Sequence, residues 1–134
     1  MTGEKSLSKI QKITDENPYT GTAEQVVTLS LGIFEASDVL SKSTFYLYRE
    51  RTGINDKVFS KLKVIGKSLQ ELKDDERREV MKALPPSYST IHQLCSLRSK
   101  ELVKGARSGA ITSSMSVRSA AEFVKQIKFP TYKA

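Results

Sequence analysis

The stretch that decides the fold is Tyr48 to Val64, YRERTGINDKVFSKLKV. Hydrophobic residues recur at helical spacing around a glycine, which predicts two helices joined by a tight turn. Gly53 tolerates positive φ at little cost, and Asn55 has a side-chain oxygen that can cap the second helix. Phe59 and Leu62 then turn toward a core. The stretch therefore predicts a helix-turn-helix, with arms at about 43–52 and 56–68.

The positions of the apolar residues in the second arm predict which of its residues are exposed. Val58, Phe59, Leu62 and Ile65 recur at three- and four-residue steps and define the buried side. The outward side then carries Asn55, Asp56, Lys57, Ser60, Lys61 and Val64. In a DNA-binding helix-turn-helix this side enters the major groove. In any other helical domain it is only a solvated surface, and the local pattern fits both interpretations.

Length and composition suit one domain, or one domain with a tail: 134 residues, 38% of them hydrophobic. No run approaches the roughly 20 apolar residues of a membrane span. The N-terminal residues lack the apolar core of a secretory signal. The single cysteine, Cys95, excludes an internal disulfide framework. We therefore expect a cytoplasmic protein that does not enter a membrane.

The net charge of +7 falls in two separate basic blocks. Residues 41–70 hold 7 Lys and Arg against 2 Asp and Glu, and residues 98–134 hold 8 against 2. The two remaining parts of the chain are slightly acidic. Basic surfaces attract nucleic acid, membranes or acidic proteins. Because one block covers the helix-turn-helix, the distribution favours nucleic acid.

The rest of the chain predicts further helices and an all-α fold. Residues 1–19 are polar without sustained periodicity, which predicts a flexible arm, and residues 20–129 form the all-helical domain. Thr22 with Gln25 forms a capping-box pattern before a buried helix at about 23–36. Four more helices are expected: one that starts at Asp74 or Asp75 and is closed by Pro85 and Pro86, one at about 87–96, one that ends at Gly109, and one at about 117–128. Tyr46 and Tyr48 are expected at the edge of the core, and 130–134 as a tail.

The sequence predicts neither a metal site nor catalysis. His92 and Cys95 are three residues apart on one predicted helix, but a tetrahedral zinc site needs three or four ligands. The chain has no second histidine or cysteine to complete such a site. It also lacks a glycine-rich phosphate loop and a nucleophile-elbow motif. We expect no enzyme, no cofactor, no metal and no small-molecule substrate.

Over about 45–128 the order of these motifs resembles the DNA-binding regions of ParB-like partition proteins and related phage and plasmid proteins. The resemblance is carried by TGINDKVFSKLKVIGKSL, LPPSYSTIHQLCSL and ITSSMSVRSAAEFV, which follow one another in that order. It implies base or groove contacts by Asn55, Lys57, Ser60 and Lys61, and a backbone or groove contact by Arg118. The chain is too short for the nucleotide-binding and dimerisation domains of a full partition protein.

These observations together predict an all-α protein that binds double-stranded DNA, as a transcriptional regulator or a partition or replication accessory factor. Base choice is assigned to the 55–61 face. The phosphate contacts, which fix register without specifying sequence, are assigned to Lys42, Arg49, Arg51, Lys63, Lys67 and Arg118. The alternative is a protein-interaction module of a mobile element that binds and inhibits a host protein. Self-association as a dimer is open in either case.

Overall fold

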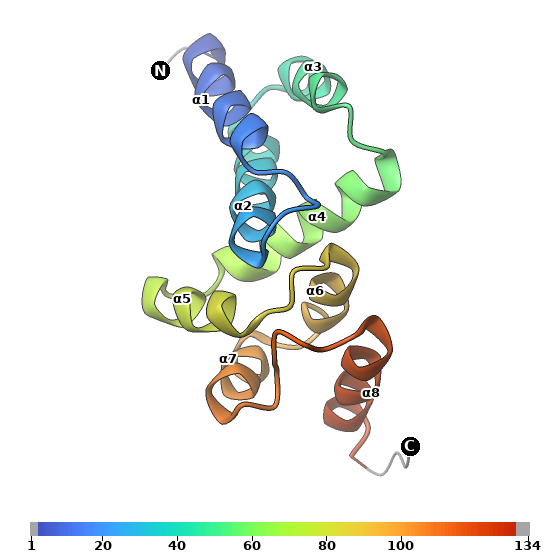
Figure 1. Cartoon of the computed structure of the whole chain (residues 1–134). Coiled ribbons are helices and arrows are strands. Elements are labelled where there is room, and N and C mark those ends of the chain that lie inside the picture. Colours follow the sequence, from blue (N-terminus) through green and yellow to red (C-terminus); the bar gives the residue numbers. More distant parts are fainter. Residues whose placement is uncertain (1–2, 131–134) are drawn as a thin grey trace.

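A long helix, α4 (Asp56–Gln70), crosses the middle of the molecule and packs most extensively against α2 (Ala23–Val39) (Figure 1). The crossing is close because Gly66 has no side chain. A Cβ atom at this position would fall on the backbone carbonyl oxygen of Ser30 and lie 2.9 Å from Cβ of Phe34. Leu62 and Ile65 of α4 are fully buried around the crossing. The two helices therefore form the centre on which the other elements pack.

The computed structural model describes residues 3–130, with side chains from Leu7 onward, and this part of the chain is all-α as expected. Six further helices surround the central pair: α1 (Gly3–Glu16), α3 (Lys42–Thr52), α5 (Asp74–Ala83), α6 (Tyr88–Leu94), α7 (Ser99–Ser108) and α8 (Val117–Lys128). Within residues 3–130 no helix is long and apolar enough to cross a membrane. The predicted tail beyond Pro130 lies outside the described residues.

Local capping motifs mark several helix ends, and the predictions for Thr22 and Gly109 are confirmed. The Thr22 hydroxyl accepts a hydrogen bond from the backbone N–H of Gln25, whose side chain accepts one from the backbone N–H of Thr22. The backbone N–H of Ser119 donates to Ser116 Oγ at the start of α8. Gly109 ends α7 with a φ of 80°, in the left-handed region that glycine tolerates. Each motif satisfies backbone groups that a helix end leaves unpaired.

The N-terminal segment differs from the flexible arm expected over 1–19, because most of it forms α1. Ile10 is only 3% exposed, and α1 packs against α2 and α3. The hydroxyl groups of Thr14 and Tyr48 lie 2.8 Å apart and share a hydrogen bond. A short polar helix with one or two apolar anchors has a weak periodic signal, which is why its sequence resembles that of an arm.

The second half of the chain extends the bundle away from α1 (Figure 1). Helix α6 packs against α4 on one side and against α8 on the other, while α7 packs against α5. Buried side chains run without interruption from Ile10 in α1 to Val124 in α8. Residues 7–130 therefore share one hydrophobic core.

Candidate nucleic-acid interface

The predicted turn between α3 and α4 is present and spans Gly53 to Asn55. Gly53 has a φ of 65°, so the chain reverses through a left-handed residue. The backbone N–H of Lys57 donates a 2.9 Å hydrogen bond to Asn55 Oδ1, which caps α4 as expected. Half-buried Ile54 packs against the core at the corner. The turn length and its glycine are typical of a helix-turn-helix.

Aromatic rings fill the space between the two arms. The Phe45 and Tyr48 rings of α3 lie 5.9 and 6.3 Å from the Phe59 ring of α4, measured between centroids. Tyr48 and Phe59 are buried, and Phe45 packs against them as a half-buried ring. The joint between α3 and α4 is therefore filled by aromatic side chains.

Arg49 lies at the joint between the two arms. Its guanidinium Nη2 is 2.9 Å from Asp56 Oδ1, and the guanidinium carbon is 5.2 Å from the centroid of the Phe59 ring. The Arg49 side chain is 34% exposed, but that of Asp56 is 85% exposed, so the carboxylate end of the ion pair is open to water. A phosphate contact by Arg49 would have to compete with the carboxylate of Asp56, which one guanidinium nitrogen, Nη2, contacts. The structure thus gives Arg49 a role in holding α3 to the start of α4.

The outward side of α4 is exposed, as predicted, and almost free of acidic groups. Lys57, Ser60 and Lys61 are all exposed, as is Asn55 at the cap. Asp56 is the only acidic residue in α4, and Arg49 neutralises it. Lys63 and Lys67 continue the exposed lysines toward the C-terminal end of the helix, with Lys63 Nζ 5.8 Å from the Phe45 ring. We call this exposed side, from Asn55 to Lys67, the α4 face.

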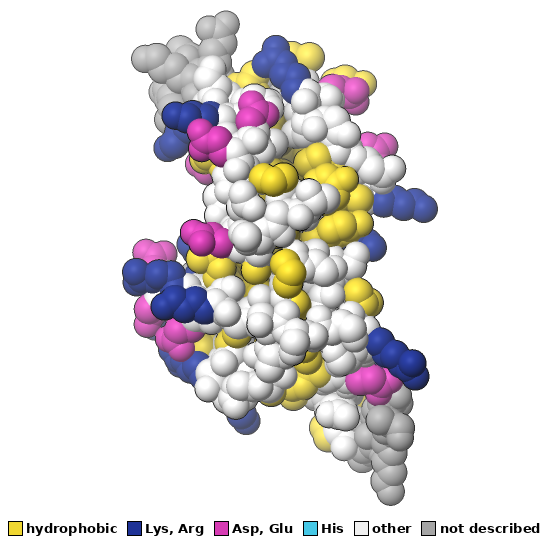
Figure 2. Space-filling view, in the orientation of Figure 1, with side chains coloured by type: hydrophobic (Ala, Val, Ile, Leu, Met, Phe, Trp, Pro, Cys, Tyr) yellow, Lys and Arg dark blue, Asp and Glu magenta, His cyan; other side chains and the backbone are white. Residues whose placement is uncertain are grey.

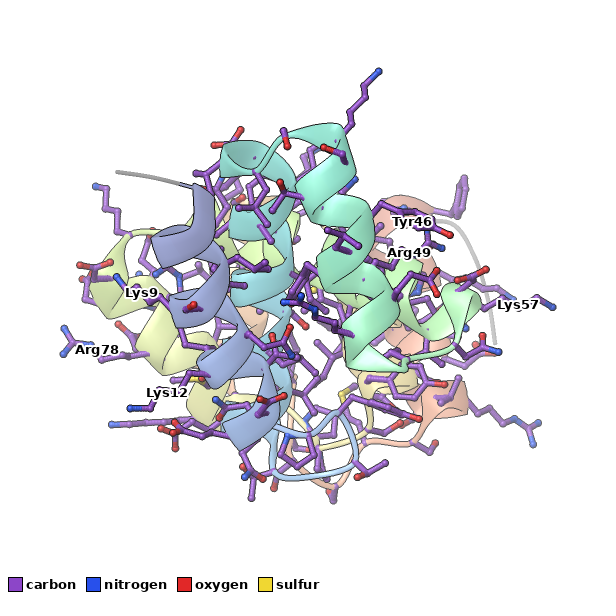
Figure 3. The ribbon with its side chains drawn as sticks, turned by 90° about the horizontal axis from the view of Figure 1, so that it is seen from above. Lys9, Lys12, Tyr46, Arg49, Lys57 and Arg78 are labelled. Carbon is purple, nitrogen blue, oxygen red and sulfur yellow. The ribbon has the colours of Figure 1, made fainter. Side chains whose placement is uncertain are left out.

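The α4 face lies beside the outer side of α3. Figure 3 shows Tyr46, Arg49 and Lys57 on the same side of the molecule, while Lys9, Lys12 and Arg78 point out on the opposite side. Hydrophobic side chains gather along the middle of the view in Figure 2, with Lys and Arg at its margins. In that view Asp and Glu also lie at the margins, among the Lys and Arg side chains.

One edge of the α4 face borders α6. Lys61 is close enough to His92 to lower the pKa of the imidazole, although burial of the ring is the larger cause of the shift. Both effects disfavour the charged imidazolium. Ser68 Oγ donates a 3.5 Å hydrogen bond to the Cys95 carbonyl oxygen, which ties the same edge of α4 to the end of α6. Lys61 thus lies at the rim of the face and Ser60 near its middle.

The other predicted phosphate contacts are exposed but dispersed. Lys42 begins α3, and Arg51 lies in its last turn, beside a shallow hollow lined by Lys12 and Asp15 of α1. Arg118 is on α8, which packs on α6 rather than beside the α4 face. The structure brings Lys63 and Lys67 into the α4 face and leaves Arg118 on another element.

Tyr46 corrects the expectation that both tyrosines of α3 lie at the core edge. Tyr48 is completely buried, whereas Tyr46 is 60% exposed. Two residues along an α-helix turn through about 200°, so neighbours at that spacing point to opposite sides. The helical period alone could therefore have shown that Tyr46 and Tyr48 point to opposite sides of α3. The exposed ring lies on the side of α3 that adjoins the α4 face (Figure 3).

The second basic block is partly neutralised by neighbouring acids. Arg107 of α7 makes a bidentate ion pair with Glu79 of α5, with N–O distances of 2.7 and 3.0 Å. The hydrogen bonds from Arg107 hold the pKa of Glu79 below its ordinary value. Glu76 of α5 lines a shallow hollow together with Lys100 and Lys104 of α7. The charge of this block is therefore a weaker argument for a DNA surface than its sequence suggests.

Among the side chains described, from Leu7 to Pro130, no group of three or more His, Cys, Asp and Glu could hold a metal ion. Cys95 is buried, and burial raises the pKa of its thiol to about 12. A thiol in this environment is a packing group and not a nucleophile at neutral pH.

The described residues form an all-α fold in which a short turn joins α3 to α4. No protein-family model matches the chain, and no curated protein or solved structure matches it. The resemblance to ParB-like DNA-binding regions therefore rests on the order of the sequence motifs.

Proposed function

We propose that the chain binds double-stranded DNA by placing the α4 face in the major groove. The observation that carries the proposal is the α4 face itself: an exposed row of lysines, with its one acidic neighbour neutralised, at the second arm of a helix-turn-helix. A helix of this kind fits the major groove, where side chains near its N-terminal end reach base edges. Asn55, Lys57, Ser60 and Lys61 are the proposed base contacts.

Phosphate contacts are assigned to the lysines around this face. Lys63 and Lys67 follow the base contacts along α4. Lys42 and Arg51 of α3 would contact phosphates farther away, because Arg51 lines a hollow with Lys12 of α1. Arg118 belongs to this set only if the DNA also reaches α8. Such contacts release counterions, so the logarithm of the binding constant should fall by about 0.9 per contact for each unit of log salt concentration. The chain would act in the cytoplasm as a transcriptional regulator or a partition or replication accessory factor.

The test begins with selection of bound fragments from random duplex DNA, followed by fluorescence anisotropy at several salt concentrations. The paired variant Lys57→Ala with Lys61→Ala removes two charges from the α4 face. The matched control, Lys9→Ala with Lys12→Ala, removes two charges from the opposite side of the molecule (Figure 3).

We expect the α4 pair to reduce the preference for the selected site over random duplex, and the control pair to leave that preference unchanged. Both pairs lower the long-range attraction for DNA by a similar amount. Absence of binding to any duplex at low salt would refute the proposal. Equal preference ratios in the parent and both variants would show that the α4 face does not contact bases.

A protein-interaction module that inhibits a host protein is the second candidate, and a different surface favours it. Tyr46 and Leu47 are 60% and 51% exposed on the outer side of α3. Exposed apolar groups of this size are typical of protein contacts when they adjoin one another. If Tyr46→Ser with Leu47→Ser abolishes the biological effect of the protein while the α4 lysine pair does not, the protein partner is the better explanation.

A further inference from the structure

Val64 is the one large apolar side chain of α4 that remains in solvent. It is 47% exposed and does not pack against the hydrophobic core. The exposed residues nearest to it along the α4 face are polar or charged: Ser60 and Lys61 one turn before it, and Lys67 one turn after it. A lone apolar group therefore stands within a polar, basic face.

Helix stability does not account for a valine at this position. A β-branched side chain loses rotamer freedom in a helix, so alanine or lysine would favour an exposed helical site more. Isolated exposed apolar residues are common on protein surfaces. Val64 differs from other exposed apolar residues in its spacing from the proposed base contacts along α4.

Lys57, Ser60, Lys61 and Val64 follow one another at steps of three, one and three residues. The residues with which the recognition helix of a homeodomain contacts bases have this same spacing. At 1.5 Å per residue, Val64 lies about 10 Å along the helix from Lys57. That distance corresponds to about three base pairs of B-DNA, whose spacing is about 3.4 Å.

We propose that Val64 contacts the C5-methyl group of a thymine in the major groove, and so makes the chain prefer thymine at one position of its site. A valine side chain has no hydrogen-bond donor or acceptor, so it cannot distinguish bases by their polar edges. The thymine methyl is the apolar group that the major groove offers. This inference rests on the proposed DNA binding and adds the identity of one base to it.

Deoxyuridine tests the contact because it differs from thymidine only by that methyl group. In the selected duplex, each thymine is replaced singly by uracil, and the dissociation constant is measured by fluorescence anisotropy at one fixed salt concentration. Loss of one buried methyl group corresponds to about a fourfold weaker equilibrium constant. We expect a loss of this size at one thymine for the parent, and none at that thymine for Val64→Ala.

Val117→Ala is the matched control, because Val117 is 46% exposed and loses the same atoms from a different helix, α8. It should keep the full sensitivity to uracil. Thermal melts of both variants establish that each is folded. Three results would overturn the contact without affecting the proposed DNA binding. They are equal affinity for every uracil duplex, a loss of affinity at that thymine that persists in Val64→Ala, and a selected site that contains no thymine. If the parent binds no duplex at low salt, the proposed function itself fails, and the contact fails with it.

Discussion

Gly66→Ala should destabilise the fold, because the added methyl group would meet the backbone of α2. The new Cβ would lie 2.7 Å from the carbonyl carbon and against the carbonyl oxygen of Ser30, and 2.9 Å from Cβ of Phe34. Carbon atoms prefer separations of about 3.5–4.0 Å, so α2 and α4 must move apart by roughly 1 Å. A backbone carbonyl cannot rotate out of the way as a flexible side chain can.

The expected change in stability is the difference between a cost of overpacking and a gain in helix propensity. Overpacking of a well-packed core costs about 1–3 kcal/mol, and a clash with backbone belongs at the upper end. Replacement of glycine by alanine inside a helix returns about 1 kcal/mol. The net loss is about 2 kcal/mol, because the first term exceeds the second. In a domain of this length that loss lowers the melting temperature by about 8 °C.

Gly32→Ala supplies the matched control, since it makes the same chemical change in the partner helix α2. A Cβ at Gly32 would meet only Ile13 Cγ2, at an ordinary contact distance of 3.5 Å. We therefore expect this variant to gain up to about 1 kcal/mol from helix propensity alone. Thermal unfolding followed by far-ultraviolet circular dichroism compares the two proteins. Equal melting temperatures would refute the close crossing of α2 and α4.

Two further predictions concern ionisation. Burial raises the pKa of Tyr48 from 10.0 to about 12, so its contribution to stability is complete below about pH 10 and is lost as the pH rises through about 12. Ultraviolet titration of the parent should show one tyrosine that ionises near pH 12, and Tyr48→Phe should lack this step. If Tyr48→Phe instead loses a step near pH 10, Tyr48 is not buried. His92, the only histidine, should titrate by NMR below its ordinary pKa of 6.5, because of burial first and Lys61 second. Lys61→Ala should raise this pKa only in part and Lys67→Ala should not change it, whereas no response to Lys61→Ala would mean that this lysine does not border α6.

Several helices of this chain could be predicted because some of their ends are encoded by short local motifs. Asn55 caps α4 through its own side chain, and Gly53 supplies the one backbone conformation that the turn requires. Ser116 similarly caps α8 through the backbone N–H of Ser119. Interactions over three or four residues need no knowledge of the rest of the fold. The exposed side of α4 could also be predicted, because its buried residues recur at the helical period.

Contacts between distant segments could not be predicted from the same signals. Thr14 and Tyr48 meet across 34 positions of the chain, so nothing local indicates that residues 7–16 belong to the fold. The role of Gly66 depends on which part of α2 crosses it. Arg49 looked like a free cation because its ion pair with Asp56 crosses the turn and forms only when the two arms are in place.

The pairing of Arg49 also changes what kind of DNA contact the α4 face can make. With Arg49 engaged, the cations within α4 itself are Lys57, Lys61, Lys63 and Lys67, all of them lysines. A lysine ammonium is a strongly hydrated point charge on a flexible stem, whereas an arginine guanidinium forms a rigid pair of hydrogen bonds to guanine or phosphate. Lys57 and Lys61 can still donate to guanine O6 and N7, but with less rigid geometry than an arginine. Discrimination would then be shared between these two lysines and the shorter side chains of the face, Asn55, Ser60 and Val64. For this reason the preference for a selected site over random duplex should be modest, and should respond to loss of one methyl group on the DNA.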